Sequence, residues 1–170
     1  MYRLNHLTKA GKVGVLCFLV SLSIGYFTGF LFVNTTTSLS PTGIEENYNG
    51  NISDNESEFD FNQELNYKKP FREIITIIHE HIISFSLIFF CTGLLLYFCE
   101  FNSRLKWLLL IEPFVSTVIT FGGIYLLWLE LTWVKYIIMI SGFLITLSYT
   151  LQISFIVREL FFIQQNKNYT

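Results

Sequence analysis

Four long apolar runs constrain this chain more than any other feature of its sequence. The only charged residue well inside any of them is Glu112, and they cover Val13–Val33, Ile82–Cys99, Trp107–Leu129 and Val134–Val157. About 20 apolar helical residues span the roughly 30 Å hydrocarbon core of a bilayer. Soluble domains carry about 25 % charged residues, whereas this sequence has 14 %. The runs therefore predict an all-α, polytopic membrane protein built as a four-transmembrane-helix bundle.

The whole chain, residues 1–170, is expected to form one membrane domain. The first run has 21 residues, longer than the apolar region of about 7–15 residues in a secretory signal, so we expect an uncleaved helix. Pro70 suits the first turn of a second helix that continues to Cys99. The predicted spans are residues 13–33, 74–99, 107–129 and 134–157.

One long polar segment, residues 34–69, separates the first two spans. It is rich in asparagine, serine, glycine and acidic residues, which favours a water-exposed loop with a turn near Pro41 and Gly43. The loops on the side of the two termini carry seven lysine and arginine residues, against four on the side of the long loop. By the positive-inside rule both termini should be cytoplasmic, and the loop should lie outside.

Small and weakly polar residues form stripes on three of the predicted spans at 100° per residue. Membrane helices associate through such faces, so the stripes should point into the bundle. The stripe of the second span is His79, Ser86 and Gly93, that of the third is Glu112, Ser116, Gly123 and Glu130, and that of the fourth is Ser141, Ser148 and Gln152. The first span offers only the common pattern Gly25-x-x-x-Gly29.

His79 and His81 stand at the outer edge of the second span. Residues two apart on a helix point about 200° apart, so the pair cannot ligate one ion within a regular helix, and it lacks the H-E-x-x-H spacing of zinc helices. His6 should lie across the membrane, which excludes a bis-histidine haem within one chain. One interfacial ion, held by a single histidine with Glu130 or loop carboxylates, remains open, as does a homodimer that supplies a second imidazole.

Three interpretations of the histidine pair follow. One histidine bonds within the bundle while the other reaches water, or the pair holds haem or a transition metal, or it handles protons. A reference pKa near 6.5 suits histidine to proton handling. If a site exists, His79 is expected to be the inward histidine and the best metal candidate, with Glu130 as its partner.

Glu112 is the second unusual residue, because it lies six positions past Lys106 and is followed by Pro113. At 1.5 Å per residue this places its carboxyl about 9 Å into the span. An intramembrane carboxylate suggests a functional site. The alternative is a structural acid that bonds to a neighbouring serine, glutamine or Lys106 near the inner interface.

Two segments, "LSPTGIEENYNG" (39–50) and "IIHEHIISFSLIFFCTGLLLYF" (77–98), resemble a group of small four-helix bacterial inner-membrane proteins. In that group a Leu-Ser-Pro-x-Gly-Ile stretch and a Tyr-x-Gly follow the first span, and a His-x-His opens the second. The matching positions here are Leu39, Ser40, Pro41, Gly43, Ile44, Tyr48, Gly50, His79 and His81. The resemblance implies a bacterial inner membrane and no particular activity.

The sequence contains no complete catalytic set, no phosphate-binding glycine loop and no basic stripe that would suit nucleic acid. It therefore favours a non-enzymatic accessory or scaffold subunit that contacts lipid and a larger membrane assembly or a second copy of itself. The alternative is a haem- or metal-binding redox or proton-handling protein that uses an outer-edge site at His79 and His81.

Overall fold

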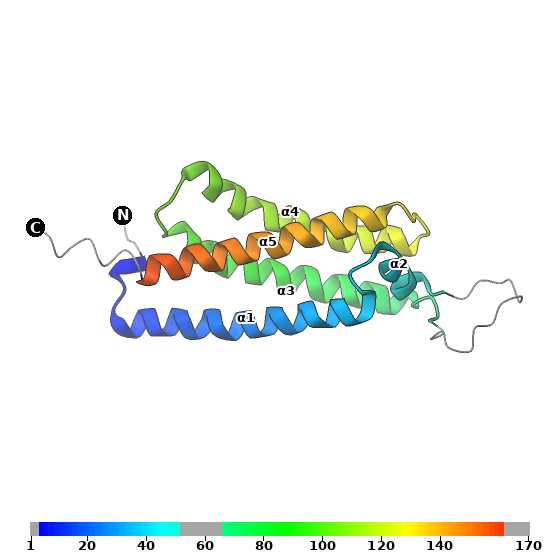
Figure 1. Cartoon of the computed structure of the whole chain (residues 1–170), viewed down its shortest axis with the longest axis horizontal. Coiled ribbons are helices and arrows are strands. Elements are labelled where there is room, and N and C mark those ends of the chain that lie inside the picture. The colour runs from blue at the N-terminus through cyan, green and yellow to red at the C-terminus, as the bar shows by residue number, and fades with distance from the viewer. Residues whose placement is uncertain (1–3, 52–65, 162–170) are drawn as a thin grey trace, which may run out of the picture.

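The computed structural model describes residues 4–51 and 66–161, and within these ranges every element is a helix. Four long helices lie alongside one another in one bundle, and a short helix caps one end (Figure 1). This arrangement confirms the predicted all-α, four-helix membrane fold. The elements in chain order are a 3₁₀ turn η1 (Leu4–His6), α1 (Lys9–Thr37), α2 (Pro41–Asn49), α3 (Phe71–Tyr97), α4 (Ser103–Trp128) and α5 (Val134–Phe161).

Each long helix is longer than its apolar run. The helices have 26 to 29 residues, which corresponds to about 39–44 Å at 1.5 Å per residue, so their ends extend past the hydrocarbon core. Capping residues set several of the helix starts. The Thr8 side chain accepts from the Gly11 N–H at 3.2 Å, and the Asn102 side chain accepts from the Arg104 N–H at 2.9 Å. Each of these bonds satisfies a free amide of the first turn.

The two ends of the bundle carry different elements (Figure 1). The start of α1, the end of α5 and the α3–α4 connection lie at one end, which we call the terminal end. The short helix α2 and the α4–α5 turn lie at the other end, which we call the cap end. His79 and His81 lie in the first half of α3, which begins at Phe71 at the cap end, and His6 belongs to η1 at the terminal end.

The core is formed mainly by α3, α4 and α5. Nine residues of α4 and ten of α5 are buried, but only Leu19 and Thr37 of the 29 residues in α1. Helix α1 is held near its middle by Tyr26, whose ring stacks on Tyr149 with centroids 4.0 Å apart and whose hydroxyl donates to Thr146 at 3.1 Å. The bundle is therefore a tightly packed three-helix unit with a fourth helix attached to one side.

The composition of residues 34–69 predicts a loop, but part of this segment is helical. Its first residues continue α1 to Thr37, and residues 41–49 form α2. Helix α2 starts here because Ser40 caps it and Pro41 occupies its first turn, where the missing proline N–H costs nothing. These local helix signals override the polar composition.

Candidate functional site

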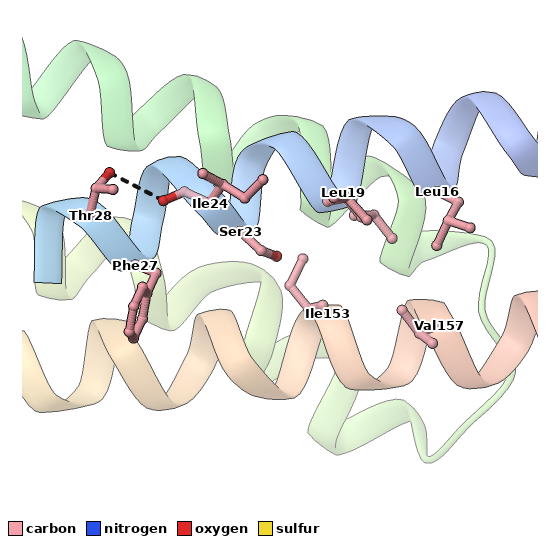
Figure 2. Close-up of a pocket in the computed structure, with 9 residues that line it drawn as sticks. Leu16, Leu19, Ser23, Ile24, Phe27, Thr28, Ile153 and Val157 are labelled. Carbon is pink, nitrogen blue, oxygen red and sulfur yellow. Dashed lines mark hydrogen bonds between the residues drawn. The ribbon is translucent and has the colours of Figure 1, made fainter.

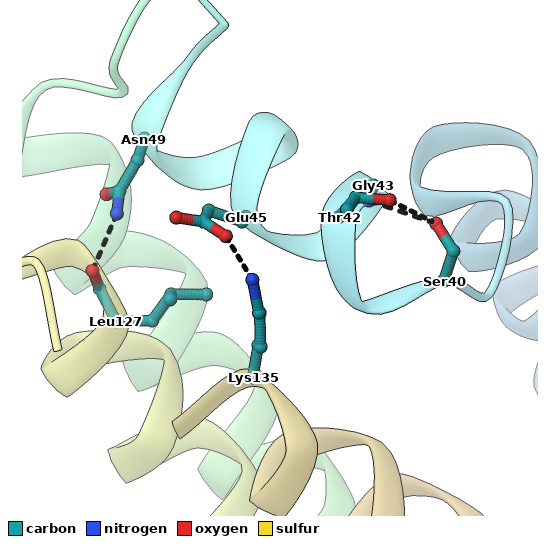
Figure 3. A network of polar contacts seen from close by, with 7 residues as sticks. All are labelled: Ser40, Thr42, Gly43, Glu45, Asn49, Leu127 and Lys135. Atoms are coloured by element: carbon teal, nitrogen blue, oxygen red, sulfur yellow. Dashed lines mark hydrogen bonds and ion pairs between the residues drawn. The ribbon is translucent and has the colours of Figure 1, made fainter. Parts of the chain in front are cut away.

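The cap end is built from the residues that carry the sequence resemblance. Ser40 Oγ accepts from the Gly43 N–H at 3.0 Å and so starts α2 (Figure 3). A Cβ atom on Gly43 would lie 2.0 Å from the Thr37 carbonyl oxygen, so no side chain fits at this position. Helix α2 can fold back on the end of α1 only because residue 43 is glycine.

Polar contacts fix α2 to the α4–α5 turn (Figure 3). Asn49 Nδ2 donates to the Leu127 carbonyl at 2.7 Å, and Lys135 Nζ lies 2.6 Å from Glu45 Oε2. The apolar face of α2 buries Ile44, and burial raises the pKa of the Tyr48 hydroxyl to about 12. The Leu127 carbonyl, in the last turn of α4, also accepts from the Glu130 N–H at 2.8 Å, so Asn49 is an additional donor that joins the cap to this turn.

The described residues just before α3 are also bonded to the cap and to α4. Gly50 has a φ of 80°, and a Cβ there would lie 2.5 Å from the Asn66 carbonyl oxygen, so this position also requires glycine. The Lys69 N–H donates to the Tyr48 carbonyl at 3.1 Å, and Trp128 Nε1 donates to the Lys69 carbonyl at 2.8 Å. The resembling residues of the loop thus have structural roles in this chain, because they build the cap.

Both histidines of the pair are exposed, and they differ in their neighbours. The ring of His81 lies 5.0 Å from that of Phe121 on α4, measured between centroids. The face of α3 that meets the bundle includes the buried Ile74 and Phe89. At 100° per residue His81 lies about 20° around the helix from Ile74 and His79 about 140°. The buried face of α3 combines large apolar side chains with Thr92 and Gly93, whereas Ser86 is only partly buried.

His81 has a defined hydrogen-bonding state. Its Nδ1 lies 2.7 Å from the Ile77 carbonyl oxygen, which can only accept, so Nδ1 carries the proton. In the neutral ring Nε2 is then left with a lone pair. Nε2 is therefore the nitrogen of His81 that could bind a ligand.

Glu130 does not face the interior, contrary to the sequence prediction. Helix α4 ends at Trp128, and Glu130 has a φ of 71° in the turn that follows, so helical periodicity no longer applies to it. Its side chain is 77 % exposed, and its Oε1 lies 2.9 Å from Lys68 Nζ. The hydrogen bond and the positive charge of Lys68 lower the pKa of the Glu130 carboxyl. Glu130 is thus the ion-pair partner of Lys68.

A metal site is not assembled in the part of the chain that the structure describes. Residues 4–51 and 66–161 contain no group of three or more histidine, cysteine, aspartate or glutamate side chains that could hold an ion. The loop carboxylates considered as further ligands, from Asp54 to Glu64, lie outside these ranges.

Within the membrane, Glu112 connects two helices. Its Oε1 accepts from Ser116 on its own helix α4, and its Oε2 accepts from Ser148 on α5. Both serines are buried, with 3 % and 5 % of their surface exposed. A carboxylate in hydrocarbon is costly unless it has such partners. The serines are the neighbours that the structural interpretation of Glu112 requires, and they leave its chemical role open.

A second polar contact compensates for Pro113. Proline has no N–H, so the Leu109 carbonyl four residues earlier loses its helical donor. Gln152 Nε2 of α5 donates to that carbonyl at 2.7 Å, while Gln152 Oε1 accepts from the Thr92 hydroxyl of α3. Gln152 is fully buried. One amide thereby connects three helices at the position where Pro113 interrupts the backbone hydrogen bonding of α4.

The remaining stripe residues lie inside, as the sequence predicts. Thr120 donates to Ser141 at 2.7 Å between α4 and α5. A Cβ on Gly123 would lie 2.8 Å from Ile138 Cγ1, so the two helices approach closely there. Thr92 and Thr120 were not predicted as interior residues, although each lies on the buried face of its helix. Their hydroxyls become recognisable only when their partners on α5 are known.

An apolar groove of about 380 Å³ runs between α1 and α5 (Figure 2). Leu16, Ser23 and Phe27 of α1 line it together with Ile153 and Val157 of α5 (Figure 2). The Ser23 hydroxyl lies 3.2 Å from that of Tyr149, so the main polar group of the groove is already paired. The groove marks where α1 is separated from the rest of the bundle.

The pattern of one protein family matches most of the chain. The family is described as a transmembrane helical domain, and the match covers residues 38–168. It begins just after α1 and includes the cap with α3, α4 and α5. No curated protein and no solved structure matches the chain.

Proposed function

This chain belongs to that family of transmembrane helical domains, and on this premise we propose that it is a non-enzymatic accessory or scaffold subunit. In this proposal α1 contacts a transmembrane helix of a larger membrane assembly, while the cap and the three-helix unit form the rigid body that positions it. The observation that supports the proposal most is the poor packing of α1, with two buried residues among 29.

The uncovered face of α1 has the residues that helix association in membranes uses. Gly14, Ser21, Gly25 and Gly29 fall within about 80° of one another at 100° per residue. A Cβ on any of these three glycines would meet nothing within 4 Å, and Ser21 is exposed. Small residues let two backbones approach closely, which favours packing between helices in lipid. Such a face favours contact with another helix over contact with lipid acyl chains.

The family match gives independent support. The matched region, residues 38–168, contains the whole three-helix unit and leaves out α1 almost entirely. A helix outside the shared domain and loosely attached to it is a suitable place for a contact with a partner.

Native gel electrophoresis of the chain solubilised in a mild detergent tests the proposal. The unmodified chain should migrate within a larger assembly, and Gly25→Leu should release it because the new side chain projects from the contact face. Gly142→Leu is the matched control, since Gly142 on α5 is also open. An assembly that survives Gly25→Leu would refute the contact, and one that contains only this chain would replace the accessory role with a homo-oligomer.

We also propose that the protein lies in a bacterial inner membrane with its terminal end in the cytoplasm. Five described cations belong to that end: Lys9, Lys12, Arg104, Lys106 and Arg158. The four at the cap end, Lys68, Lys69, Arg72 and Lys135, are fewer. Short loops rich in lysine and arginine stay inside. A cysteine at Thr42 in the cap should react with an impermeant maleimide in intact cells and one at Lys9 should not, and the reverse would invert this orientation.

A second candidate function rests on His81. Its protonated Nδ1 leaves Nε2 available, which is the arrangement that haem- and metal-binding histidines use. An optical spectrum and metal analysis of the purified protein decide between the candidates. A Soret band or stoichiometric metal that disappears in His81→Ala and persists in His79→Ala would favour this second function, and its absence would leave the accessory role.

A further inference from the structure

We propose that Glu112 is a proton-binding site within the membrane, at the lipid-facing seam between α4 and α5. This inference is independent of the accessory role, because it concerns the three-helix unit rather than α1. The ligand is a proton. The Ser148 hydroxyl can hydrogen-bond to the carboxyl in both its ionised and its protonated form.

The ionised form of the site is the one whose contacts the structure shows. Each carboxylate oxygen of Glu112 accepts one hydroxyl, from Ser116 and from Ser148. Hydrogen bonds to a charged acceptor are roughly twice as strong as neutral ones. Two hydroxyls on two oxygens are a fitting arrangement for a carboxylate that has no cation beside it.

The protonated form can be satisfied by a rotation of one hydroxyl. A proton on Glu112 Oε2 would donate to Ser148 Oγ, and the Ser148 hydroxyl would then turn to the carbonyl four residues earlier, that of Leu144. Other hydroxyls of α5 already make this bond, as Ser141 does to Ile137 at 2.8 Å and Ser154 does to Thr150 at 2.7 Å. One proton enters from water, one hydroxyl rotates, and no other bond changes.

The other ionisable groups near Glu112 bond elsewhere, so the two serines are the partners of its carboxyl. Lys106 on the same helix donates to the Cys99 and Tyr97 carbonyls at the end of α3. On α5, Tyr149 is occupied by Ser23 and by the ring of Tyr26, and Glu159 accepts from the Glu100 N–H at 3.3 Å. The other titratable and charged groups on the two remaining long helices are Arg72, Glu73, His79, Glu80, His81, Cys91 and Tyr97 of α3 and Lys9, Lys12, Cys17 and Tyr26 of α1. In the part of the chain that the structure describes, none of them forms a hydrogen bond or an ion pair with Glu112. Within the described residues no ion pair to Glu112 is formed, so a proton is the simplest way to remove its charge from hydrocarbon.

The position of Glu112 on α4 leaves it accessible from the membrane. At 100° per residue it lies about 40° from Leu108, 60° from Val115 and 20° from Ile119, all of which are exposed, and about 40° from the buried Ser116. Glu112 itself is only partly buried. The carboxyl therefore lies at the boundary between the packed interface and lipid, where a proton or an apolar reagent can reach it.

Dicyclohexylcarbodiimide tests the proposal, because this apolar reagent modifies protonated carboxyls within membranes. The full chain in phosphatidylcholine vesicles is treated at a series of pH values, and modified Glu112 is quantified by mass spectrometry. Modification should fall as the pH rises and should be lost in Glu112→Gln, whose amide can still bond to both serines. Ser148→Ala removes a donor to the charged form, so the pH midpoint of the modification should move upward.

Ser154→Ala is the matched control, since its hydroxyl bonds only within α5 on an exposed position. It should leave the midpoint unchanged, and circular dichroism should show equal helix content in all variants. The proposal is overturned if Glu112 is not modified at any pH, or if Ser148→Ala and Ser154→Ala have the same midpoint. Suppression of labelling by sodium chloride but not by potassium chloride at fixed pH would assign the site to a metal cation instead, and would also overturn it.

Discussion

Replacing Gln152 with leucine should destabilise the bundle, because the side chain supplies a donor that Pro113 removes from α4. The Leu109 carbonyl would lose its partner at 2.7 Å inside the membrane. A buried carbonyl without a partner costs about 1–3 kcal/mol, while measured interhelical hydrogen bonds in membranes average about 0.6 kcal/mol and reach about 1.7. The Thr92 hydroxyl keeps the Ile88 carbonyl at 3.0 Å. We therefore expect a loss of about 1–2 kcal/mol in the free energy of unfolding.

A double-mutant cycle identifies the cause. Pro113→Ala restores a backbone N–H that can bond to Leu109 within the helix, so Gln152→Leu should then cost about 1 kcal/mol less than it does beside proline. The free energies are measured by reversible unfolding with sodium dodecyl sulfate in mixed micelles. Thr150→Leu, at an exposed position of α5, is the control and should be nearly neutral. Equal costs of Gln152→Leu in the two backgrounds would refute the role assigned to the amide.

Three further predictions concern packing and charge. Gly123→Leu should lower the free energy of unfolding by about 1–3 kcal/mol through overpacking, since even a Cβ there is too close to α5. Gly122→Leu, on the open side of α4, should be nearly neutral, and equal losses in micelle unfolding would contradict the rotation of α4. Gly43→Ala should detach the cap, seen as faster proteolysis between α1 and α3, and unchanged proteolysis would contradict the close approach. Lys68 lowers the pKa of the Glu130 carboxyl below its ordinary value of 4.5, so the ion pair stabilises the fold at pH values above 4.5. This contribution is lost as the pH falls through the lower pKa of the carboxyl in the folded protein. NMR titration should show that Lys68→Met abolishes the lowering of the pKa, and a lowering that persists would exclude the pair as its cause.

The sequence predicts the membrane fold and the small polar residues of the α4–α5 interface because both follow from simple physical patterns. Charge-free runs of membrane length identify the four helices, and small polar residues at helical spacing identify the α4–α5 interface, including Ser116 and Ser141. These inferences needed only the rise and the rotation per residue of a helix. They fail where the helix ends, as Glu130 shows by its positive φ directly after α4.

Other features depend on contacts between distant segments. His81 contacts the ring of Phe121, a residue 40 positions away on α4, and the spacing of residues within α3 does not reveal that contact. Gln152 and Pro113 are 39 positions apart, and only their juxtaposition explains either residue. The cap has local signals, since Ser40 and Pro41 start a helix, yet its docking on the α4–α5 turn is decided by Asn49 and its distant partner carbonyl.

The most direct test of the proposed role is photocrosslinking from α1 in intact cells. A photoreactive benzoylphenylalanine at Ser21, which is exposed on the small-residue face of α1, is compared with one at Ile140, which is exposed on α5. The accessory role predicts a discrete adduct with another membrane protein from position 21 and none from position 140. The same pattern from both positions, whether lipid alone or the same adduct, would contradict α1 as the contact with a membrane assembly.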